Sequence, residues 1–499
     1  MSTSRLEPSA TRPSSNEGLV HTLTHLVVLV ALLTSSAIYE AHRITAFRTG
    51  DIWLHLRTGM WILENHSIPK VGIFSQFPDR PWIAVSWAYD LFLAIAYRLM
   101  GLRAFPAILI IFRALVASAT FLLAYMRHRQ FWSSVLLSGA AQYVVVNLQP
   151  LPATVSIIAF AFALNTLLEA HENGNIRQLR SLPLLFLLWA NFDSRFLLGL
   201  ALLAIYGVVE VVVPALRVSH WSGALKLSAL WLMLSALVTL VNPYTFRIYV
   251  DAFRTLYARV MLVNFEDLSA MNFRQSPHFV LLLLLMSAFL VLGRQRSRDM
   301  FKIVSLVAAT ALAFRIQRDT WPAILISVVV ISDALPAFAK RLVEDRNSKR
   351  TYMRIAVPTL ATIVILGIAI TTLPSPDSLM PRIARIFPVK ACDYVVSHHL
   401  PKPIFNAYVW GGFVTWYMPD YAVAMDSRTN LYGDDLTNAY LEVASGKRRL
   451  DAEPAFAQVQ TILLQTDSSM AIALMTLPAL QQQFGLVYQD EVAAVFVRR

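Results

Sequence analysis

Twelve long apolar runs, separated by short polar segments, constrain this chain more than any other feature of its sequence. Of its 499 residues, 56% are hydrophobic and only 15% are charged, so a water-soluble fold of this length could not bury all its apolar surface. Lipid must therefore be the solvent for most of the chain. The runs lie at 20–39, 87–99, 105–126, 132–147, 152–169, 181–192, 197–215, 222–241, 277–293, 301–314, 320–338 and 355–373.

Basic residues in the loops set the expected orientation of these runs. Sixteen Lys and Arg residues lie in five loops, against seven in the loops that alternate with them, and the more basic set should face the cytoplasm. With the N-terminus inside, this pattern requires that one early run does not cross the membrane. The run 87–99 carries Asp90 and Arg98 and is short for a span, so we expect it to lie in the outer interface. About eleven spans then remain.

The same orientation gathers the polar residues within or beside the spans on the outer face. A charged group is costly near the centre of a bilayer, so a gathering on one side indicates a polar cavity that opens outward. The residues concerned are Asp51, His55, Asn191, Asp193, Glu266, Asp267, Arg315, Arg318 and Asp319.

The two ends of the chain differ in composition from its apolar middle. Residues 1–19 are rich in Ser, Thr and Pro and are expected to form a disordered cytoplasmic tail. In 374–499, short β-rich runs alternate with helical ones, which predicts a small extracytoplasmic α/β domain. The predicted fold class is therefore mostly α: a polytopic transmembrane helical bundle over 20–373, with a large first outer loop at 40–104, and a C-terminal α/β domain.

Individual stretches of the C-terminal segment support this prediction. KACDYVVSHHL is typical of a short helix, whereas QTILLQTD and AVFVRR are typical of strands. Gly411 and Gly412 are expected in a tight turn before an aromatic segment. A strand is also expected just before Asp426 and Arg428.

Composition also excludes some classes of protein. The net charge of +12 comes from clusters in short loops rather than from a separate basic patch, so no nucleic-acid partner is expected. Cys392 is the only cysteine in the chain, which rules out an internal disulfide and a cysteine-based metal cluster.

Asp51 and His55 stand where the first apolar run gives way to a polar loop. They are four residues apart, on one face of a helix predicted for IWLHLRTGMWIL. Asp51 can act as a general base toward a hydroxyl nucleophile, or it can simply cap this helix. His55 can orient the acid, bind phosphate, or act as an interfacial hydrogen-bonding residue. A third metal ligand is not evident beside the two, although a divalent ion stays open.

Other candidates carry a functional and a structural interpretation side by side. Trp53 can stack on a sugar or belong to an interfacial aromatic belt. Asp193 can contact an acceptor or form an ion pair with Arg195 at a helix break. Glu266 can hold an acceptor or a metal, or it can be a solvated loop charge. Asp426 and Arg428 can recognise an acceptor, with a structural salt bridge as the default.

Several blocks resemble the GT-C class of bacterial multi-pass membrane glycosyltransferases. The blocks are DIWLHLRTGMWILENHSIPKVGIFSQF, WANFDSRFLLGL, VNPYTFRIYV, RIQRDTWPA and the tail from FPVKACDYVV to the end, spread over about 45–499. The second block departs from the asparagine-leucine-histidine-glycine common in relatives, since this chain has Asn191, Phe192, Asp193 and Ser194 there.

The resemblance implies an enzyme of the bacterial inner membrane that passes a sugar from a polyprenyl-phosphate donor to a glycan, lipid or protein acceptor on the outer side. An acid in the first outer loop serves such enzymes as general base, and Asp51 occupies that position. One base and one attack on the anomeric carbon imply inversion. The leaving phosphate needs cations, for which Arg57, Arg315 and Arg318 are the candidates. The alternative is a related protein without transfer activity, acting as a transporter, flippase or scaffold in envelope polysaccharide assembly.

Overall fold

The fold is taken from a computed structural model of the chain. It describes residues 24–34, 38–39, 47, 49–145, 151–216, 222–257, 259–265, 268–335, 367 and 371–499. The tail predicted to be disordered, 1–19, lies outside the described residues, as do Glu266 and Asp267 and most of the last apolar run at 355–373.

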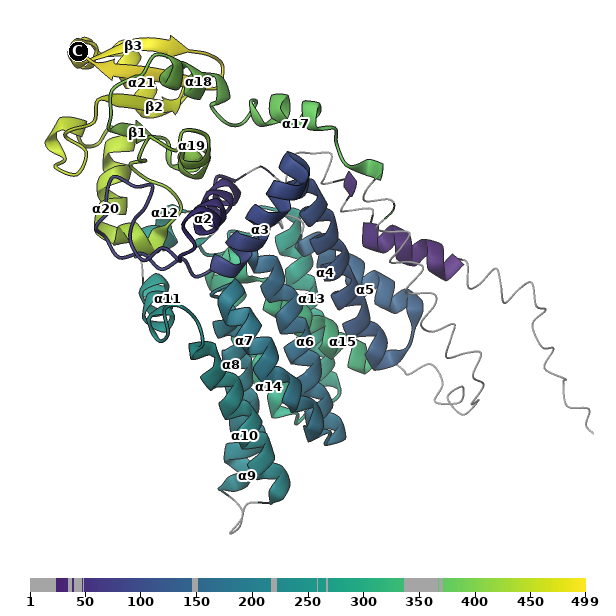
Figure 1. Cartoon of the computed structure of the whole chain (residues 1–499). Coiled ribbons are helices and arrows are strands. Elements are labelled where there is room, and N and C mark those ends of the chain that lie inside the picture. The colour runs from purple at the N-terminus through teal and green to yellow at the C-terminus, as the bar shows by residue number, and fades with distance from the viewer. Residues whose placement is uncertain are drawn as a thin grey trace, which may run out of the picture.

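A bundle of helices occupies the apolar middle of the chain (Figure 1). Helices form at nearly all of the predicted runs, because each run has helical length, few charges and Pro only near an end or a break. α4 packs against α5, α6 and α15, and α13 packs against α5 and α15. The bundle helices are α4 (Ala104–His128), α5 (Phe131–Val144), α6 (Pro152–Asn173), α7 (Leu182–Phe192), α8 (Phe196–Gly207), α10 (Gly223–Leu237), α13 (Ser276–Arg294), α14 (Met300–Arg315) and α15 (Trp321–Ala334).

The outer faces of the bundle carry large apolar side chains that the protein itself does not cover. Leu136, Leu283 and Leu290 are 74%, 63% and 71% exposed. Such a surface is stable only against lipid, and it identifies the chain as a membrane protein. Among the described residues, five helical stretches are long and apolar enough to cross a membrane. The count of eleven spans and their orientation stay predictions.

The run at 87–99 forms its own helix, α3 (Trp87–Met100), which lies at an angle to α4 (Figure 1). Gly101 separates the two with φ 59° and ψ −143°, a conformation that glycine adopts without strain. α3 packs against α2 (Asp51–Asn65), α4 and α7. Its predicted place in the membrane interface stays a prediction.

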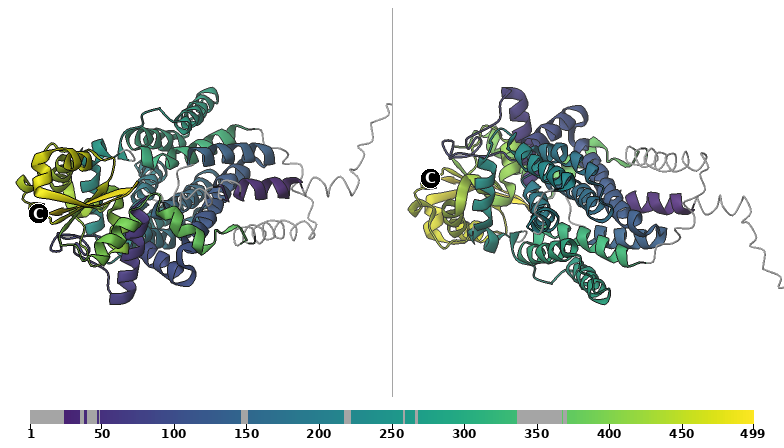
Figure 2. Two further views of the ribbon diagram at one scale, coloured as in Figure 1. Left: turned by 90° about the horizontal axis from the view of Figure 1, so that it is seen from above. Right: turned by 90° about the horizontal axis from the view of Figure 1, so that it is seen from below.

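A compact α/β domain follows the bundle in the chain and lies at one end of it, as both views of Figure 2 show. The sheet has the order β1-β2-β4-β3, formed by β1 (Ile404–Asn406), β2 (Thr461–Gln465), β3 (Phe484–Gln489) and β4 (Ala493–Arg498). β1 and β2 are parallel, and the other two pairs are antiparallel. The predicted helix and the two predicted strands are confirmed as α18 (Val389–Ser397), β2 and β4.

Further helices complete this end of the molecule. α17 (Pro376–Ile383) leads into the domain, and α19 (Gly411–Tyr417), α20, α21 and α22 surround the sheet. Two short helices of the loop 242–276 lie beside them. Their bounds are α11 (Arg247–Tyr257), α12 (Arg259–Asn264), α20 (Thr429–Ala444), α21 (Ser469–Thr476) and α22 (Pro478–Gln483).

Two expectations for the C-terminal domain were wrong in detail. Gly411 and Gly412 do not form a tight turn but begin the helix α19 (Gly411–Tyr417). The strand expected before Asp426 is reduced to isolated bridges of Val423 with Ser75 and Ile404. In both places tertiary packing decides the backbone, since the apolar alternation alone favours a strand.

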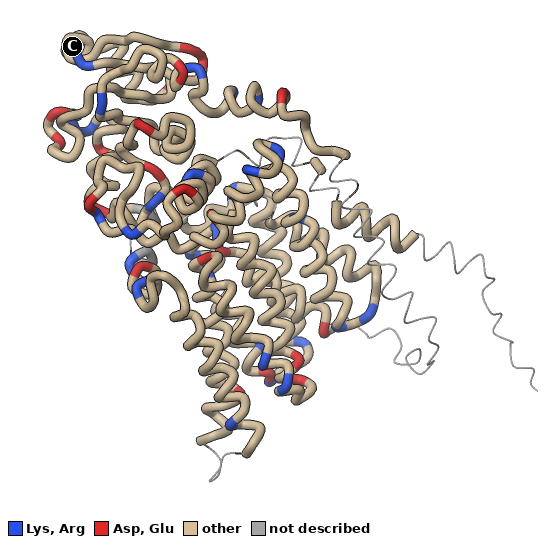
Figure 3. Tube along the Cα trace, viewed as in Figure 1, with Lys and Arg blue, Asp and Glu red and all other residues tan. Residues whose placement is uncertain are grey.

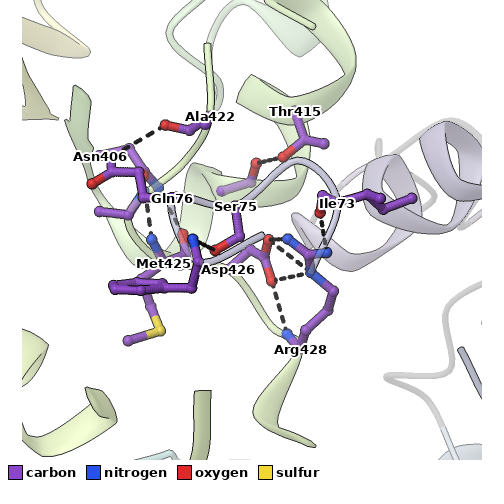
Figure 4. A network of polar contacts seen from close by, with 12 residues as sticks. Ile73, Ser75, Gln76, Asn406, Thr415, Ala422, Met425, Asp426 and Arg428 are labelled. Atoms are coloured by element: carbon purple, nitrogen blue, oxygen red, sulfur yellow. Dashed lines mark hydrogen bonds and ion pairs between the residues drawn. The ribbon is translucent and has the colours of Figure 1, made fainter. Parts of the chain in front are cut away.

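The first outer loop packs directly on the C-terminal domain, three hundred residues away in the sequence. Gln76 donates from Nε2 to the carbonyl of Ile404 at 2.5 Å, and Arg80 donates to the carbonyl of Tyr432 at 2.8 Å. Arg428 donates to the carbonyl of Ile73 (Figure 4). The two predicted outer segments therefore form one body.

Glycines allow the closest approach within this body. A Cβ on Gly50 would lie 2.5 Å from the carbonyl oxygen of Val409, and one on Gly412 would lie 2.1 Å from the carbonyl oxygen of Gly50. Neither contact can accommodate a side chain. The start of α2 is thus held against the start of α19.

The other end of the bundle is held by a network of charges, and Figure 3 shows acidic and basic residues gathered at that end. Lys302 lies 2.6 Å from Glu172 and 2.7 Å from Asp333, and Arg127 pairs with the same two acids. His171 bridges Glu210 and Asp299 at 2.8 and 3.1 Å. The network ties together the ends of α4, α6, α14 and α15.

We expect Lys302→Met to lower the thermal stability of the purified protein. Three carboxylates lose a shared cation that is only 14% exposed, which should cost about 2 kcal/mol. Thermal unfolding in detergent measures the effect. The exposed Arg298, to which the described residues give no hydrogen bond or ion pair, supplies the control Arg298→Met, and equal melting temperatures for the two variants would contradict the prediction.

Candidate functional site

A cavity of about 400 Å³ lies where the bundle, the first outer loop and the C-terminal domain meet. Its polar wall comes from α2, α3, the turn between α7 and α8, and the short helix η7 (Gln317–Asp319). Its apolar wall comes from the ends of α5, α6 and α13. α11 and the first residues of α20 close it from the side of the C-terminal domain.

Asp51 is the first residue of α2 and faces this cavity. Gly50, not Asp51, is the N-cap residue, and no side chain caps the helix, so the interpretation of Asp51 as the cap is wrong. The described residues give the Asp51 carboxylate no hydrogen bond and no ion pair. The oxygens of Asp51 are therefore available to a substrate.

His55 lies one turn after Asp51 on the same face of α2. Its Nδ1 is 2.6 Å from Oδ1 of Asp90 on α3, so it is held by Asp90 rather than by Asp51. Burial lowers the pKa of His55, but the charge of Asp90 and its hydrogen bond outweigh burial and leave the pKa above its usual value. Asp51 and Asp193 act in the same direction.

Asp193 and Arg195 form the ion pair expected at the break between α7 and α8, at 3.2 Å. Asp193 also accepts a hydrogen bond from Ser156, and Arg195 donates from Nε to Asp319 at 2.7 Å. These charges satisfy one another within the protein. They form a rigid polar wall of the cavity rather than free reactive groups.

Arg318 is the cation that this wall leaves available. It lines the cavity, its side chain is exposed there, and the described residues give it no hydrogen bond or ion pair. Surrounding protein and the nearby Arg195 lower its pKa, while Asp319, Asp51 and Asp193 act in the opposite direction. A guanidinium stays charged in any such setting, so Arg318 offers free donors to an anion.

The other two predicted phosphate ligands do not line the cavity. Arg57 pairs with Glu64 at 3.2 Å and lies over the ring of Phe74, because its position in α2 puts it on another face than Asp51. Arg315 is the last residue of α14 and is exposed elsewhere. Of the three predicted phosphate ligands, only Arg318 lines the cavity that Asp51 faces.

Trp53 is a core residue, which corrects the prediction that it stacks on a sugar. It is 0% exposed and packs on Trp416 with ring centroids 4.5 Å apart, and on Phe105 at 5.2 Å. An interfacial belt is excluded for the same reason. α2 turns Trp53 toward the C-terminal domain while it turns Asp51 toward the cavity.

Asp426 and Arg428 form a buried ion pair with 1% and 4% exposure (Figure 4). Arg428 also lies over the ring of Trp82 at 4.8 Å. Arg428 touches the cavity wall, but its donors are used by Asp426 and by the first outer loop. The prediction that Asp426 and Arg428 form a structural salt bridge is therefore confirmed.

Sequence reasoning missed two groups that line the cavity. Asp90 appeared only as a charge that shortens an apolar run, and Asp251 of α11 was not considered. Asp251 accepts a hydrogen bond from Asn430 of α20 at 3.2 Å, and burial raises its pKa to about 6. No spacing in the sequence signals either pairing, because the partners lie 35 and 179 residues apart.

The described residues contain no group of three His, Cys, Asp or Glu side chains placed to hold a metal ion. Asp51 and His55 therefore lack a third ligand among them. The divalent ion that the sequence left open stays untested.

Solved structures with the same architecture are membrane glycosyltransferases. The structure is similar to the archaeal oligosaccharyltransferase AglB from Archaeoglobus fulgidus in complex with an inhibitory peptide and a dolichol-phosphate, with 11% identity, a TM-score of 0.50, and coverage of 97% of this chain and 74% of that chain. It is also similar to ArnT from Cupriavidus metallidurans bound to undecaprenyl phosphate, with 14% identity, a TM-score of 0.47, and coverage of 97% and 98%. A third likeness is to the arabinofuranosyltransferase AftD from Mycobacteria, with 10% identity, a TM-score of 0.47, and coverage of 99% and 40%.

The likeness to AglB shows that the chain has a GT-C-like fold, as the sequence blocks predicted. At this identity it shows the fold alone. No protein-family model matches the sequence, and no curated protein matches it.

We expect Arg428→Gln to destabilise the protein and to loosen the first outer loop from the C-terminal domain. The variant leaves Asp426 buried without its cation, at a cost of about 3–5 kcal/mol. Thermal unfolding measures the loss, and limited proteolysis of 66–86 measures the loosening. Arg449, which pairs with Asp451 at the surface, provides the control Arg449→Gln, and the prediction fails if both variants melt like the wild type.

Proposed function

We propose that this protein is an integral membrane glycosyltransferase. It moves a sugar from a polyprenyl-phosphate donor to an extracytoplasmic glycan, lipid or protein acceptor, with Asp51 as general base. The proposal places the N-terminus in the cytoplasm and the C-terminal domain outside a bacterial inner membrane. The GT-C-like fold and the apolar surface of the bundle support this setting.

One observation carries the proposal. An acid and a cation, Asp51 and Arg318, face the same cavity without a hydrogen bond or ion pair to any described residue. The other charged residues in that wall are paired, Asp90 with His55 and Asp193 with Arg195. A site with one free base and one free cation suits a substrate that presents a hydroxyl to the first and a phosphate to the second.

The chemistry follows from that pair. Asp51 takes the proton of the acceptor hydroxyl as its oxygen forms a bond to the anomeric carbon of the donor sugar. The bond from that carbon to the phosphate oxygen breaks, and the electron pair leaves with the polyprenyl phosphate. Arg318 neutralises the charge that develops there. A single displacement of this kind inverts the configuration at the anomeric carbon.

The surroundings of the cavity support a lipid-linked donor. One wall is apolar and is built from the ends of bundle helices, through Val145, Leu151 and Leu281 among others. The opposite side is formed by Ser427, Arg428, Thr429 and Asn430 of the C-terminal domain. The AglB structure of the same fold is a complex with a dolichol-phosphate and a peptide.

We expect Asp51→Asn to reduce sugar transfer by about 10²–10⁴-fold with donor binding retained, because the amide cannot take up the proton. Transfer of radiolabelled sugar from a panel of polyprenyl-phosphate donors, in membranes with matched protein levels, measures the effect. The acceptors are those present in the same membranes.

Asp79 supplies a matched control for this experiment, since it is an exposed acid of the same loop that does not line the cavity. Asp79→Asn should transfer like the wild type. Equal transfer by Asp51→Asn and the wild type would remove Asp51 as the base. Transfer by no form of the protein with any donor would favour the non-catalytic transporter or scaffold.

We expect Arg318→Gln to weaken binding of the donor by on the order of 10–100-fold, because the phosphate loses a charge-assisted partner. The donor concentration for half-maximal transfer measures this change. Arg98→Gln, at an exposed position of α3 outside the cavity, should leave it unaltered. An unchanged value for Arg318→Gln would show that the phosphate binds elsewhere.

A further inference from the structure

The pairing of His55 with Asp90 depends on an unusually close crossing of α2 and α3. A Cβ on Gly59 would lie 1.9 Å from the carbonyl oxygen of Asp90 and 2.8 Å from Cβ of Ala94, so only glycine fits there. His55 stands one turn before Gly59 on α2. The crossing therefore brings its ring against the side chain of Asp90.

The geometry of this pair determines which ring nitrogen faces the cavity. Nδ1 lies 2.6 Å from Oδ1 of Asp90, a carboxylate that is 3% exposed and has no other side-chain partner among the described residues. An ionised carboxylate only accepts, so with Asp90 ionised Nδ1 carries the proton of this bond. Nε2 is left without a hydrogen bond to a described residue, on a ring that lines the cavity with 22% exposure.

The charged groups that raise the pKa of His55 from the elements around it are all acids. Asp90 comes from α3, Asp51 from its own helix and Asp193 from the end of α7. Tyr89 of α3 meets the ring edge-on as a neutral group, at 5.5 Å between centroids. On α19, Tyr417 is engaged with Asp393 instead. Three arginines line the same cavity: Arg195 and Arg428 are paired with Asp193 and Asp426, and Arg318 has no hydrogen bond or ion pair to a described residue.

We propose that Asp90 is a positioning residue that holds His55 as a cation, with Nε2–H directed into the cavity as a donor to the phosphate of the polyprenyl-phosphate substrate. This inference rests on the proposed function and adds a second phosphate ligand to Arg318. The phosphate then lies between an imidazolium and a guanidinium, with Asp51 one helical turn from the former.

The role of Asp90 differs from that of a merely structural acid, because it decides how phosphate binding depends on pH. With Asp90 present, the effect of burial is outweighed and the pKa of His55 lies above its usual value. In Asp90→Asn the burial remains while the opposing charge is gone, so His55 loses its proton at lower pH. Phosphate binding should weaken in that variant as pH rises, and recover as pH falls.

The test measures binding of polyprenyl phosphate alone, without sugar or acceptor, to the full-length protein in lipid nanodiscs between pH 5.5 and 8.5. Each dissociation constant is divided by that of the wild type at the same pH, which cancels titration of the phosphate itself. We expect Asp90→Asn to bind about tenfold more weakly at pH 8 and nearly normally at pH 5.5. His55→Gln should bind weakly throughout, and the double variant should match His55→Gln.

Glu64→Gln supplies the control, since Glu64 lies on α2 but pairs with Arg57 away from the cavity. Its ratio should stay near one at every pH. Should Asp90→Asn not fold, ¹⁵N spectra of histidine-labelled wild type, with His55 identified by comparison with His55→Gln, give a second test. The inference requires that Nδ1 of His55 carries a proton and that Nε2 stays protonated at pH 7.

The outcomes separate this inference from the function on which it rests. The role of Asp90 is overturned if the ratio of dissociation constants for Asp90→Asn equals one at pH 8 or does not change with pH. In that case, binding of polyprenyl phosphate by the wild type still supports the proposed donor. Absence of polyprenyl-phosphate binding by the wild type at every pH overturns the proposed function and this inference together.

Discussion

The position of α2 is the constraint on which the rest of this structure depends. The helix is wedged between the bundle and the C-terminal domain, and glycine permits the close approach on both sides: Gly59 against α3, and Gly50 with Gly412 against α19. One face of α2 then lines the cavity through Asp51 and His55, and another buries Trp53 among aromatic rings. A shift of this helix by the width of one methyl group would move the acid, the histidine and the core together.

Charge pairing divides the residues around the cavity into a wall and a reactive set. Asp193, Arg195 and Asp319 satisfy one another, and so do Asp426 and Arg428. In a low-dielectric setting such pairs are stable only when complete, so they hold the backbone in place and are not available to a ligand. Asp51 and Arg318 stand out against this background because the described residues leave both unpaired. This contrast, rather than the presence of charge, distinguishes the proposed site.

The first outer loop and the C-terminal domain are more closely joined than their separation in the chain implies. Gln76, Arg80 and Arg428 make their contacts with backbone carbonyls of the opposite segment. Such contacts depend little on the side chains of the partner, and they hold the loop that follows α2 against the C-terminal domain. The first outer loop and the C-terminal domain therefore build this side of the cavity together, and neither could form it alone. α11 completes it through Asp251.

The sequence by itself determined the helices of the bundle and the change to an α/β domain, and it singled out Asp51 and His55 as candidate site residues. Hydrophobic periodicity, turn residues and loop charge are local properties, and they act over the length of one element. Only the tertiary structure decided which arginine accompanies Asp51, that Trp53 belongs to the core, and that His55 is held by Asp90. Those outcomes depend on the face that each helix turns to its neighbours and on partners far away in the chain. A local sequence pattern predicts neither the packed face of a helix nor its distant partners, because the same residues in another packing would have other partners.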